Sequence, residues 1–374
     1  MIIFLLIFLC LYGGINFYAF FRAKNIFHFS GTTEIIIITL LIFLILAPVI
    51  IRIIEKFHGE TLARSIAYFG YFWMAFVFLF FFLNITLDTA RYVFNFFYQS
   101  KEIFLLKDVF FSLAVFLSFI FVVYGFFDAQ KIRVKRLEIH TDKTLSNNGK
   151  IRIVQISDVH IGLIIRDKRL KVILDRVKEE KPDILVSTGD LLDGELSYVM
   201  PEARQLAEIK PIFGKYAIPG NHEYYAGIEE AMEFTKKAGF DILRDEKRQV
   251  AGINIIGRDD ITGRKLGLVQ NSPHLSELLP ATPSSAFILL LKHQPDIRED
   301  ANFNLQLSGH THNGQIFPFK LVTRLFFPKN YGYFRLGENK SIYVTSGAGT
   351  WGPPVRFFAP PEITVIDLIG RKDN

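Results

Sequence analysis

The sequence of 374 residues contains a single cysteine and carries little charge in its first third. Because Cys10 has no partner cysteine in the chain, an internal disulfide and a cysteine-ligated zinc or iron–sulfur site are excluded. Residues 1–130 hold 8 of the 43 Lys and Arg residues and 7 of the 37 Asp and Glu residues, so this third is too apolar for a water-soluble fold. The net charge is only +6, and residues 131–374 show no basic stripe interleaved with aromatics. The sequence therefore argues against nucleic acid as a partner.

Four apolar runs in this third are long enough to cross a bilayer, which takes about 20 mostly apolar residues. They cover residues 2–21, 35–54, 66–87 and 109–127. The alternative for the first run is a cleaved signal peptide. It lacks a preceding Lys or Arg, and Phe8 and Leu9 are too bulky for lipoprotein cleavage before Cys10. We therefore predict that residues 1–130 form a four-span transmembrane anchor.

The charged residues of this region favour an anchor over a transport pathway. Ionisable groups inside a bilayer are costly and mark ion or substrate routes. Arg52, Asp88 and Asp108 fall at the ends of the predicted spans, so we expect no buried charge. With four spans, seven basic residues flank the membrane on the side of the C-terminal part and five on the other side. This excess predicts a multi-pass cell-membrane protein with a cytoplasmic C-terminal domain.

From residue 131 the pattern changes to that of an α/β domain. Residues 131–149 alternate like an edge strand and form a linker, and residues 150–374 alternate short β-rich runs with amphipathic helices. A helix is predicted over 168–180. Buried-type strands are predicted at 151–156, 184–188, 215–218, 286–292 and 304–308. Each of these strands is followed at once by polar residues, which is where α/β folds place functional groups.

The residues that follow these strands have the chemistry of metal ligands. In chain order they are Asp158-Val-His160, Gly189-Asp190-Leu-Leu-Asp193, Gly220-Asn221-His222-Glu223, His293 and Gly309-His310-Thr-His312. Carboxylate, amide and imidazole groups without thiolate suit Mn, Fe, Zn, Ni or Co, and two such ions about 4 Å apart can clamp a phosphate. Gly-Asp or Asp-x-His alone is common in turns. Five of the nine histidines fall in these blocks, however, so we interpret the blocks as one site.

In this order the five blocks resemble the signature of the calcineurin-like metallophosphoesterase superfamily, over residues 150–368. The tail from Ser346 to Arg356 and the run Pro361-Glu362-Ile are similar to membrane-associated bacterial phosphoesterases. Transmembrane metallophosphoesterases also share the layout with a multi-span N-terminus. The resemblance implies two mixed β-sheets packed as a sandwich with helices outside, and metals at the loops along one edge.

Carried over residue by residue, the resemblance implies two divalent metal ions, with Mn, Fe or Zn expected. One ion is assigned to Asp158, His160, Asp190 and His312, and the other to Asp190, Asn221, His293 and His310. His222 is the expected catalytic residue, contacting the scissile phosphate without binding metal. Asp193 stands where purple acid phosphatases have tyrosine, so we expect no iron–tyrosinate site. Instead, Asp193 is expected to orient a ligand histidine.

The expected activity is hydrolysis of a phosphodiester or pyrophosphate bond by metal-activated water. The anchor favours a phosphate-ester substrate in the membrane, such as a lipid or a nucleotide-linked lipid. Arg356 is a candidate substrate-binding residue, because a guanidinium matches phosphate oxygens bidentately. Its alternative is a surface arginine that closes a Pro-rich loop. A nuclease with the same dimetal site and a non-catalytic membrane receptor or scaffold are the alternative functions, and the complete ligand set disfavours the scaffold.

Overall fold

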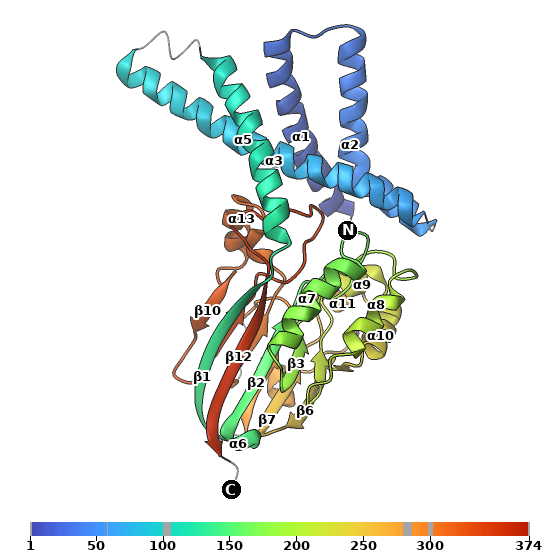
Figure 1. The fold of residues 1–374 in the computed structure, drawn as a ribbon, viewed down its shortest axis with the longest axis vertical. Coiled ribbons are helices and arrows are strands. Elements are labelled where there is room, and N and C mark those ends of the chain that lie inside the picture. Colours follow the sequence, from blue (N-terminus) through green and yellow to red (C-terminus); the bar gives the residue numbers. More distant parts are fainter. Residues whose placement is uncertain (1, 58, 100–105, 280–285, 298–301, 373–374) are drawn as a thin grey trace. The chain divides into compact units, whose positions relative to one another are not determined.

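The computed structural model of the protein describes residues 2–57, 59–99, 106–279, 286–297 and 302–372 (Figure 1). The chain divides into two compact units. The first consists of Met1–Asp128 and Gly352–Phe357, and the second of Ala129–Trp351 and Phe358–Asn374. The sequence placed 150–374 in one domain, whereas the structure groups six residues near its end with the helical unit.

The first unit is helical. Its helices are α1 (Ile2–Phe27), α2 (Thr32–Lys56), α3 (Glu60–Tyr98) and α5 (Lys107–Ala129), whose last residue begins the second unit. Within the described residues, these four helices are long and apolar enough to cross a membrane, which confirms the four predicted apolar helices. Helix α3 continues well past the predicted span 66–87. At 1.5 Å per residue it is about 60 Å long, about twice the hydrocarbon thickness of a bilayer.

The helical unit holds a cluster of charged and polar side chains around Asp88. Arg22 of α1 pairs with Asp88 of α3 at 2.8 Å, and Arg91 lies 3.4 Å from the other oxygen of Asp88 and is only 4% exposed. The Asn84 side chain accepts hydrogen bonds from Arg22 (3.0 Å) and Tyr18 (2.9 Å). Helix α3 does not end near residue 87, where the predicted span ends. Asp88 and Arg91 lie within the helix, and their charges compensate one another.

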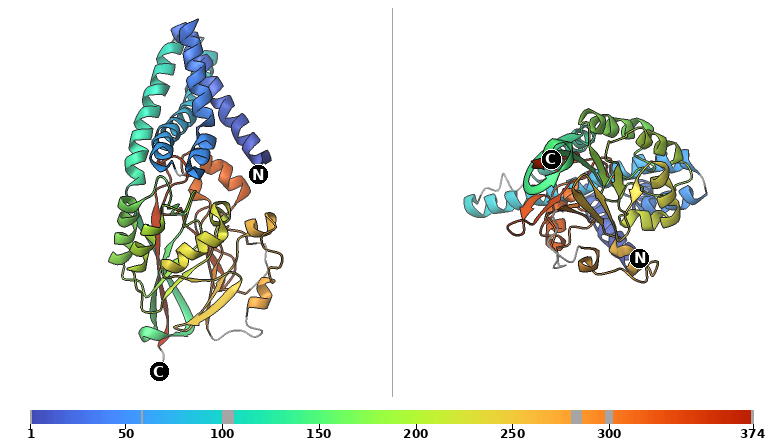
Figure 2. Two further views of the ribbon diagram at one scale, coloured as in Figure 1. Left: turned by 90° about the vertical axis from the view of Figure 1, so that its right-hand side faces the viewer. Right: turned by 90° about the horizontal axis from the view of Figure 1, so that it is seen from below.

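The second unit is built on two mixed sheets, each with six strands among the described residues (Figures 1 and 2). In spatial order the first sheet contains β1 (Arg133–Leu145), β12 (Glu362–Lys372), β2 (Lys150–Ile156), β3 (Ile184–Ser187), β4 (Lys215–Ala217) and β5 (Asp241–Ile242). The second contains β10 (Gly332–Arg335), β11 (Ser341–Val344), β9 (Leu305–Ser308), β8 (Phe287–Leu291), β7 (Ile253–Gly257) and β6 (Glu246–Val250). Strands β2, β3 and β4 run parallel, as do β7, β8 and β9.

The remaining elements of this unit are helices. They are α6 (Ser146–Gly149), α7 (Asp167–Glu179), α8 (Met200–Ala207), α9 (Asn221–Ala226), α10 (Ile228–Lys237), α11 (Ile261–Lys265), α12 (Leu275–Leu278), the 3-10 helix η1 (His312–Gly314) and α13 (Phe319–Phe326). The predicted helix 168–180 corresponds to α7, whose apolar residues at helical spacing are buried.

The two sheets pack face to face because apolar side chains alternate between the faces of the strands. In β8, Phe287, Leu289 and Leu291 join the core between the sheets, whereas Ile288 and Leu290 face the other side. On the outer face of the first sheet, α7, α8 and α10 contribute to a second core. These layers confirm the predicted α/β fold with two mixed sheets.

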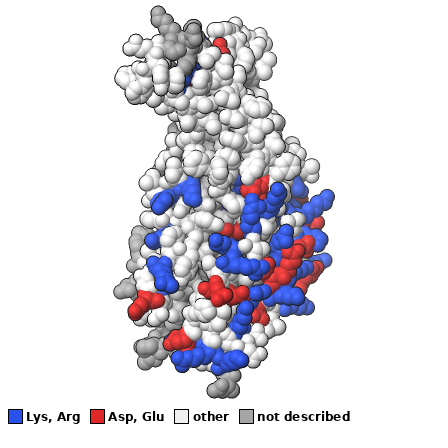
Figure 3. Space-filling view, turned by 60° about the vertical axis from the view of Figure 1, so that its left-hand side comes forward, with Lys and Arg blue, Asp and Glu red and all other residues white. Residues whose placement is uncertain are grey.

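Charge divides between the two units as the sequence indicates. On the face shown in Figure 3, Lys, Arg, Asp and Glu are sparse over the helical unit. Over the second unit, basic and acidic side chains are intermixed, and the basic ones form no continuous stripe on this face.

Candidate metal centre

Loops that follow five parallel strands hold the candidate ligands. In the first sheet, β2, β3 and β4 lead to Asp158, Asp190 and Asn221, and in the second, β8 and β9 lead to His293 and His310. Within each sheet these strands are parallel neighbours. Their carboxyl ends therefore lie on the same side of the sheet, where a rigid scaffold can aim several side chains at one point.

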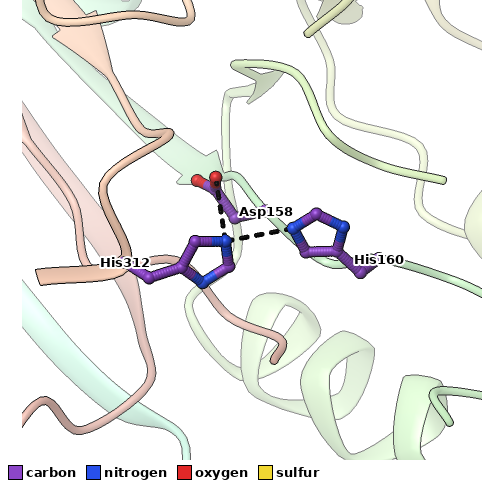
Figure 4. Close-up of side chains that lie close together, drawn as sticks. All are labelled: Asp158, His160 and His312. Atoms are coloured by element: carbon purple, nitrogen blue, oxygen red, sulfur yellow. Dashed lines mark hydrogen bonds and ion pairs between the residues drawn. The ribbon is translucent and has the colours of Figure 1, made fainter. Parts of the chain in front are cut away.

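One group consists of Asp158, His160 and His312, whose candidate ligand atoms lie within 4.8 Å of one another (Figure 4). The Nε2 atoms of the two histidines are 3.0 Å apart, and His312 Nε2 is 3.5 Å from Asp158 Oδ1. All three residues are buried. Asp158 and His160 come from the loop after β2 and His312 from the loop after β9, so the group forms only when both sheets are in place.

A second group consists of Asp190, His293 and His310. His293 Nε2 lies 3.2 Å from Asp190 Oδ2, 3.1 Å from Asn221 Oδ1 and 3.2 Å from His310 Nδ1. Asp190 Oδ2 is also 3.9 Å from His160 Nε2 in the first group. The Asp190 carboxylate therefore lies between the two groups.

The first group fits a bound cation. The Nε2 atoms of His160 and His312 lie together beside Asp158 Oδ1, and the other Asp158 oxygen, Oδ2, is buried without a hydrogen-bond partner. Burial raises the pKa of Asp158 to about 6 and lowers the pKa of both His160 and His310 to about 3, so both rings are neutral, the form that binds metal. Buried carboxylate oxygens beside unprotonated ring nitrogens lack a compensating charge, and a divalent cation would supply it.

His293 is held by a hydrogen bond on its far side. Its Nδ1–H donates to the Thr188 carbonyl at 2.8 Å, which turns Nε2 towards Asp190 and Asn221. Such a contact fixes the orientation of a ligand histidine. Although burial opposes protonation, the carboxylate of Asp190 raises the pKa of His293, so this part of the site attracts positive charge.

The backbone is strained at the candidate ligands. Left-handed φ values between 49° and 71° occur at Asp158, His160, Asp190, His310 and His312. This region is uncommon for residues other than glycine, and such strain concentrates at functional sites. Backbone N–H groups also orient the carboxylates: that of His310 donates to Asp158 Oδ1 (2.8 Å), and that of His222 donates to Asp190 Oδ1 (2.9 Å).

Two motif glycines make room for these carboxylates. A Cβ atom on Gly309 would lie 2.1 Å from Asp158 Oδ2, and one on Gly220 would lie 2.2 Å from Asp190 Oδ1. Both distances are far below van der Waals contact. A glycine is therefore required at each position by close approach of a neighbouring side chain.

Gly309→Ala is expected to reduce metal occupancy and to lower stability by about 1–3 kcal/mol, the usual cost of overpacking. The added methyl group must displace Asp158 or the loop after β9. Metal content by elemental analysis and thermal unfolding measure the two effects. Gly337→Ala is the control, because its Cβ would meet only Lys340 Cβ, at 3.8 Å. Full metal occupancy in Gly309→Ala would show that this close packing is not needed.

Glu223 joins the two central loops, a role that we did not assign from sequence. Its Oε2 accepts hydrogen bonds from the N–H groups of Gly220 (2.6 Å) and Asp190 (3.0 Å), and its Oε1 accepts from Leu192 (3.0 Å). It is 1% exposed. The available signal was an acidic residue three positions after the N-cap of α9, the pattern of a capping box.

Glu223→Gln is expected to weaken metal binding by about 10–100-fold, the usual effect of a residue that holds ligands in place. The amide keeps the shape of the side chain but turns an NH₂ group towards a backbone N–H. Titration calorimetry with Mn²⁺ measures the change. Glu179→Gln on the exposed surface of α7 is the matched control. Equal affinity in both variants would contradict a supporting role for Glu223.

His222 lies beside the first group and contacts Asp193. Its Nδ1 is 3.0 Å from Asp193 Oδ1, and its ring meets that of His160 edge-on with centroids 4.6 Å apart. Asp193, which we expected to orient a ligand histidine, contacts His222, and His160, Asp193 and His222 form a further group whose candidate ligand atoms lie within 4.8 Å of one another. Although burial opposes protonation, Asp190 and Asp193 raise the pKa of His222 to about 9.

Two aromatic residues that we did not single out from sequence flank His222. The rings of Tyr225 and Trp351 each lie 5.6 Å from the His222 ring, and the two residues are 59% and 46% exposed. Gln315 holds Trp351 by two hydrogen bonds of 2.9 Å to its backbone. An exposed tryptophan that is fixed by its backbone suits contact with a ligand, but no local pattern in the sequence distinguishes it.

Arg356 belongs to the short segment Gly352–Phe357 of the helical unit. Arg356 is fully buried, and its backbone N–H donates a hydrogen bond to the Gly125 carbonyl of α5 at 2.9 Å. The alternative of a surface arginine closing a loop is therefore wrong. Its role as a phosphate ligand stays a prediction.

Comparison with known proteins identifies the family. The family model for calcineurin-like phosphoesterases matches residues 151–314. The chain is 36% identical over 261 residues to a metallophosphoesterase of Aquifex aeolicus, covering 69% of this chain and 99% of the relative. It is 30% identical over 380 residues to a metallophosphoesterase of Campylobacter jejuni, covering 99% of each. A transmembrane protein with a metallophosphoesterase domain from Danio rerio is 33% identical over 270 residues, covering 68% of this chain and 62% of the relative. The resemblance drawn from the five motif blocks is thus confirmed: the chain belongs to the calcineurin-like metallophosphoesterases, which are metal-dependent phosphoric ester hydrolases.

Proposed function

We propose that this protein is a membrane-anchored phosphoesterase that uses two divalent ions, Mn, Fe or Zn, to hydrolyse a phosphodiester or pyrophosphate bond. The observation that carries the proposal is the position of Asp190. Its carboxylate lies 3.2 Å from His293 in one group and 3.9 Å from His160 in the other. A single carboxylate between two groups of ligands is the arrangement that two neighbouring ions require.

In this proposal the ligands divide into two sets that share Asp190. One set is Asp158, His160, Asp190 and His312, and the other is Asp190, Asn221, His293 and His310. The bound ions would supply positive charge for the phosphate oxygens and activate a water for in-line attack.

His222 is proposed to act on the leaving group. Its Nδ1 is bonded to Asp193, so its Nε2–H is free to donate a proton to the oxygen that departs from phosphorus. The hydrogen bond and the negative charge of Asp193 favour the protonated ring that a general acid requires. Asp193 would hold the ring in this orientation.

The substrate is proposed to be a phosphate ester in the membrane, such as a lipid or a nucleotide-linked lipid. Four apolar helices and relatives described as transmembrane metallophosphoesterases support a membrane protein. We propose a multi-pass protein of the cell membrane whose second unit faces the cytoplasm, as the seven-to-five excess of flanking basic residues indicates.

The test uses the full-length protein, purified in detergent, stripped with a chelator and reloaded with Mn²⁺. Phosphomonoesters, phosphodiesters, lipid pyrophosphates and oligonucleotides are assayed in parallel, and metal content is measured by elemental analysis. We expect two ions per chain and metal-dependent cleavage of diester or pyrophosphate bonds. One ion per chain would contradict the dimetal site, and preferred cleavage of oligonucleotides would favour a nuclease.

A further inference from the structure

Helix α13 and the residues before it present an apolar surface to solvent. None of the helix's residues is buried, and Leu321, Leu325 and Phe326 are 58%, 82% and 75% exposed. We call this the α13 surface, made of Phe317, Phe319, Leu321, Val322, Leu325 and Phe326. Soluble proteins seldom expose so many neighbouring large apolar side chains, and such patches mark sites of interaction.

The polar residues of α13 share one side of the helix. At 100° per residue, Lys320, Thr323 and Arg324 occupy one arc, and the apolar residues occupy the rest of the circumference. An apolar face with basic residues on the other side is the pattern of helices that lie in the plane of a membrane interface. The sequence alone does not reveal this, because an apolar face of the same kind could equally be covered by another part of the fold.

The stretch of chain that contains α13 is basic. No Asp or Glu occurs between Asn302 and Gly337, and this stretch contains Lys320, Arg324, Lys329 and Arg335. A surface that packs against a second copy of itself, or against a surface with both acidic and basic residues, does not require an excess of basic residues. Basic residues around an apolar face complement the headgroups of anionic lipids.

The α13 surface is connected to the metal centre through the loop that carries His312. Thr311 donates a hydrogen bond to the Asn330 carbonyl at 2.5 Å, and the Asn330 side chain donates to Thr323 in α13 at 3.3 Å. The ring of Phe327, directly after α13, meets the ring of His310 with centroids 5.1 Å apart. The α13 surface therefore lies next to the loop that carries two candidate ligands, His310 and His312.

A lipid bilayer is the expected partner of the α13 surface. The chain carries four apolar helices, so the domain works tethered to a membrane. The ring of Phe358 lies 6.1 Å from that of Phe317 in the α13 surface. In the chain, Phe358 directly follows the segment Gly352–Phe357, which belongs to the helical unit. We propose that the α13 surface docks into the headgroup region of an anionic bilayer. Docking itself does not depend on the proposed function. Its consequence, that the metal centre meets lipid phosphates at the membrane interface, rests on the proposed function.

The experiment uses full-length protein in nanodiscs, with the single cysteine removed by Cys10→Ser. Leu325→Cys is labelled with an environment-sensitive fluorophore, and nitroxide-labelled lipid with the spin label near the headgroup serves as quencher. The control probe is Ile212→Cys, because Ile212 is 70% exposed. It precedes the amino end of β4, whereas the metal centre lies at the carboxyl ends of the strands. The bilayers are phosphatidylcholine alone or an equal mixture with phosphatidylglycerol.

We expect the nitroxide lipid to quench the probe at position 325 by more than half in the anionic nanodiscs, with little quenching at position 212. Quenching should be weaker in phosphatidylcholine alone, and equal quenching in both would overturn the assignment to anionic lipid. A probe at 325 that is shielded equally in detergent and in nanodiscs, without quenching by lipid, would overturn docking. The surface would then be covered by the helical unit or by a second copy.

A second measurement separates docking from the proposed chemistry. Leu325→Glu should lower the hydrolysis of a bilayer-embedded phosphodiester several-fold while leaving a soluble nitrophenyl ester unaffected, because the Leu325 side chain is 82% exposed to solvent. If docking is observed but neither substrate is hydrolysed by the parent protein, the proposed function fails and the docking surface stands. Equal loss on both substrates would contradict an interfacial role for α13.

Discussion

Asp190→Asn is expected to lose phosphoester hydrolysis together with most of its bound metal. The Asp190 carboxylate is 2% exposed and lies between the two groups of candidate ligands. Asparagine keeps the shape of the side chain but removes the negative charge and one of the two oxygens. Both ions should therefore be affected, and the loss of affinity should exceed the roughly 10–100-fold effect of residues that only support ligands.

Elemental analysis, Mn²⁺ titration and rates on a diester substrate measure this outcome. Asp142→Asn serves as the control, because the Asp142 side chain is 73% exposed on β1. Thermal unfolding of the metal-free proteins shows whether any loss reflects misfolding. Two ions and normal turnover in Asp190→Asn would refute the shared-carboxylate assignment. Loss of one ion only would place Asp190 in a single group.

His222→Ala is expected to keep both ions and to lose about 10²–10⁴-fold in rate, the usual contribution of a positioned general acid or base. Among the candidate histidines, His222 is distinguished by its hydrogen bond to Asp193 and by its aromatic neighbours Tyr225 and Trp351. His140→Ala is the control, since the His140 side chain is 71% exposed on β1. Loss of an ion from His222→Ala would show that His222 is a ligand.

A series of leaving groups separates two roles for His222. If it donates a proton to the departing oxygen, the loss should shrink for nitrophenolate, which needs little protonation. If it stabilises charge on the phosphoryl group, good and poor leaving groups should suffer alike. Asp193→Asn should follow the same trend with a smaller loss, because the ring stays in place without its charged partner.

Much of the fold could be predicted because its signals are local. The apolar runs, the period of α7 and the buried strands each depend on a few consecutive residues, and the structure places elements where they predict. The length of α3 is an exception. The sequence has no Pro or Gly between Gly70 and Tyr98 to end the helix, and hydropathy alone ended the predicted span near residue 87. The position of Asp88 and Arg91 inside the helix follows from this extra length.

The sequence by itself determined the chemistry of the candidate site: which residue types follow which strands, in which order, with which glycines. It could do so because parallel strands bring such residues to one edge whatever the remaining details. Only the tertiary structure decided that Asp193 binds His222, that Glu223 joins two loops and that Trp351 lies beside the site. It also decided that the apolar side of α13 is left exposed. Each of these depends on which distant segments meet, and contact between distant segments leaves no periodic signal in a single sequence.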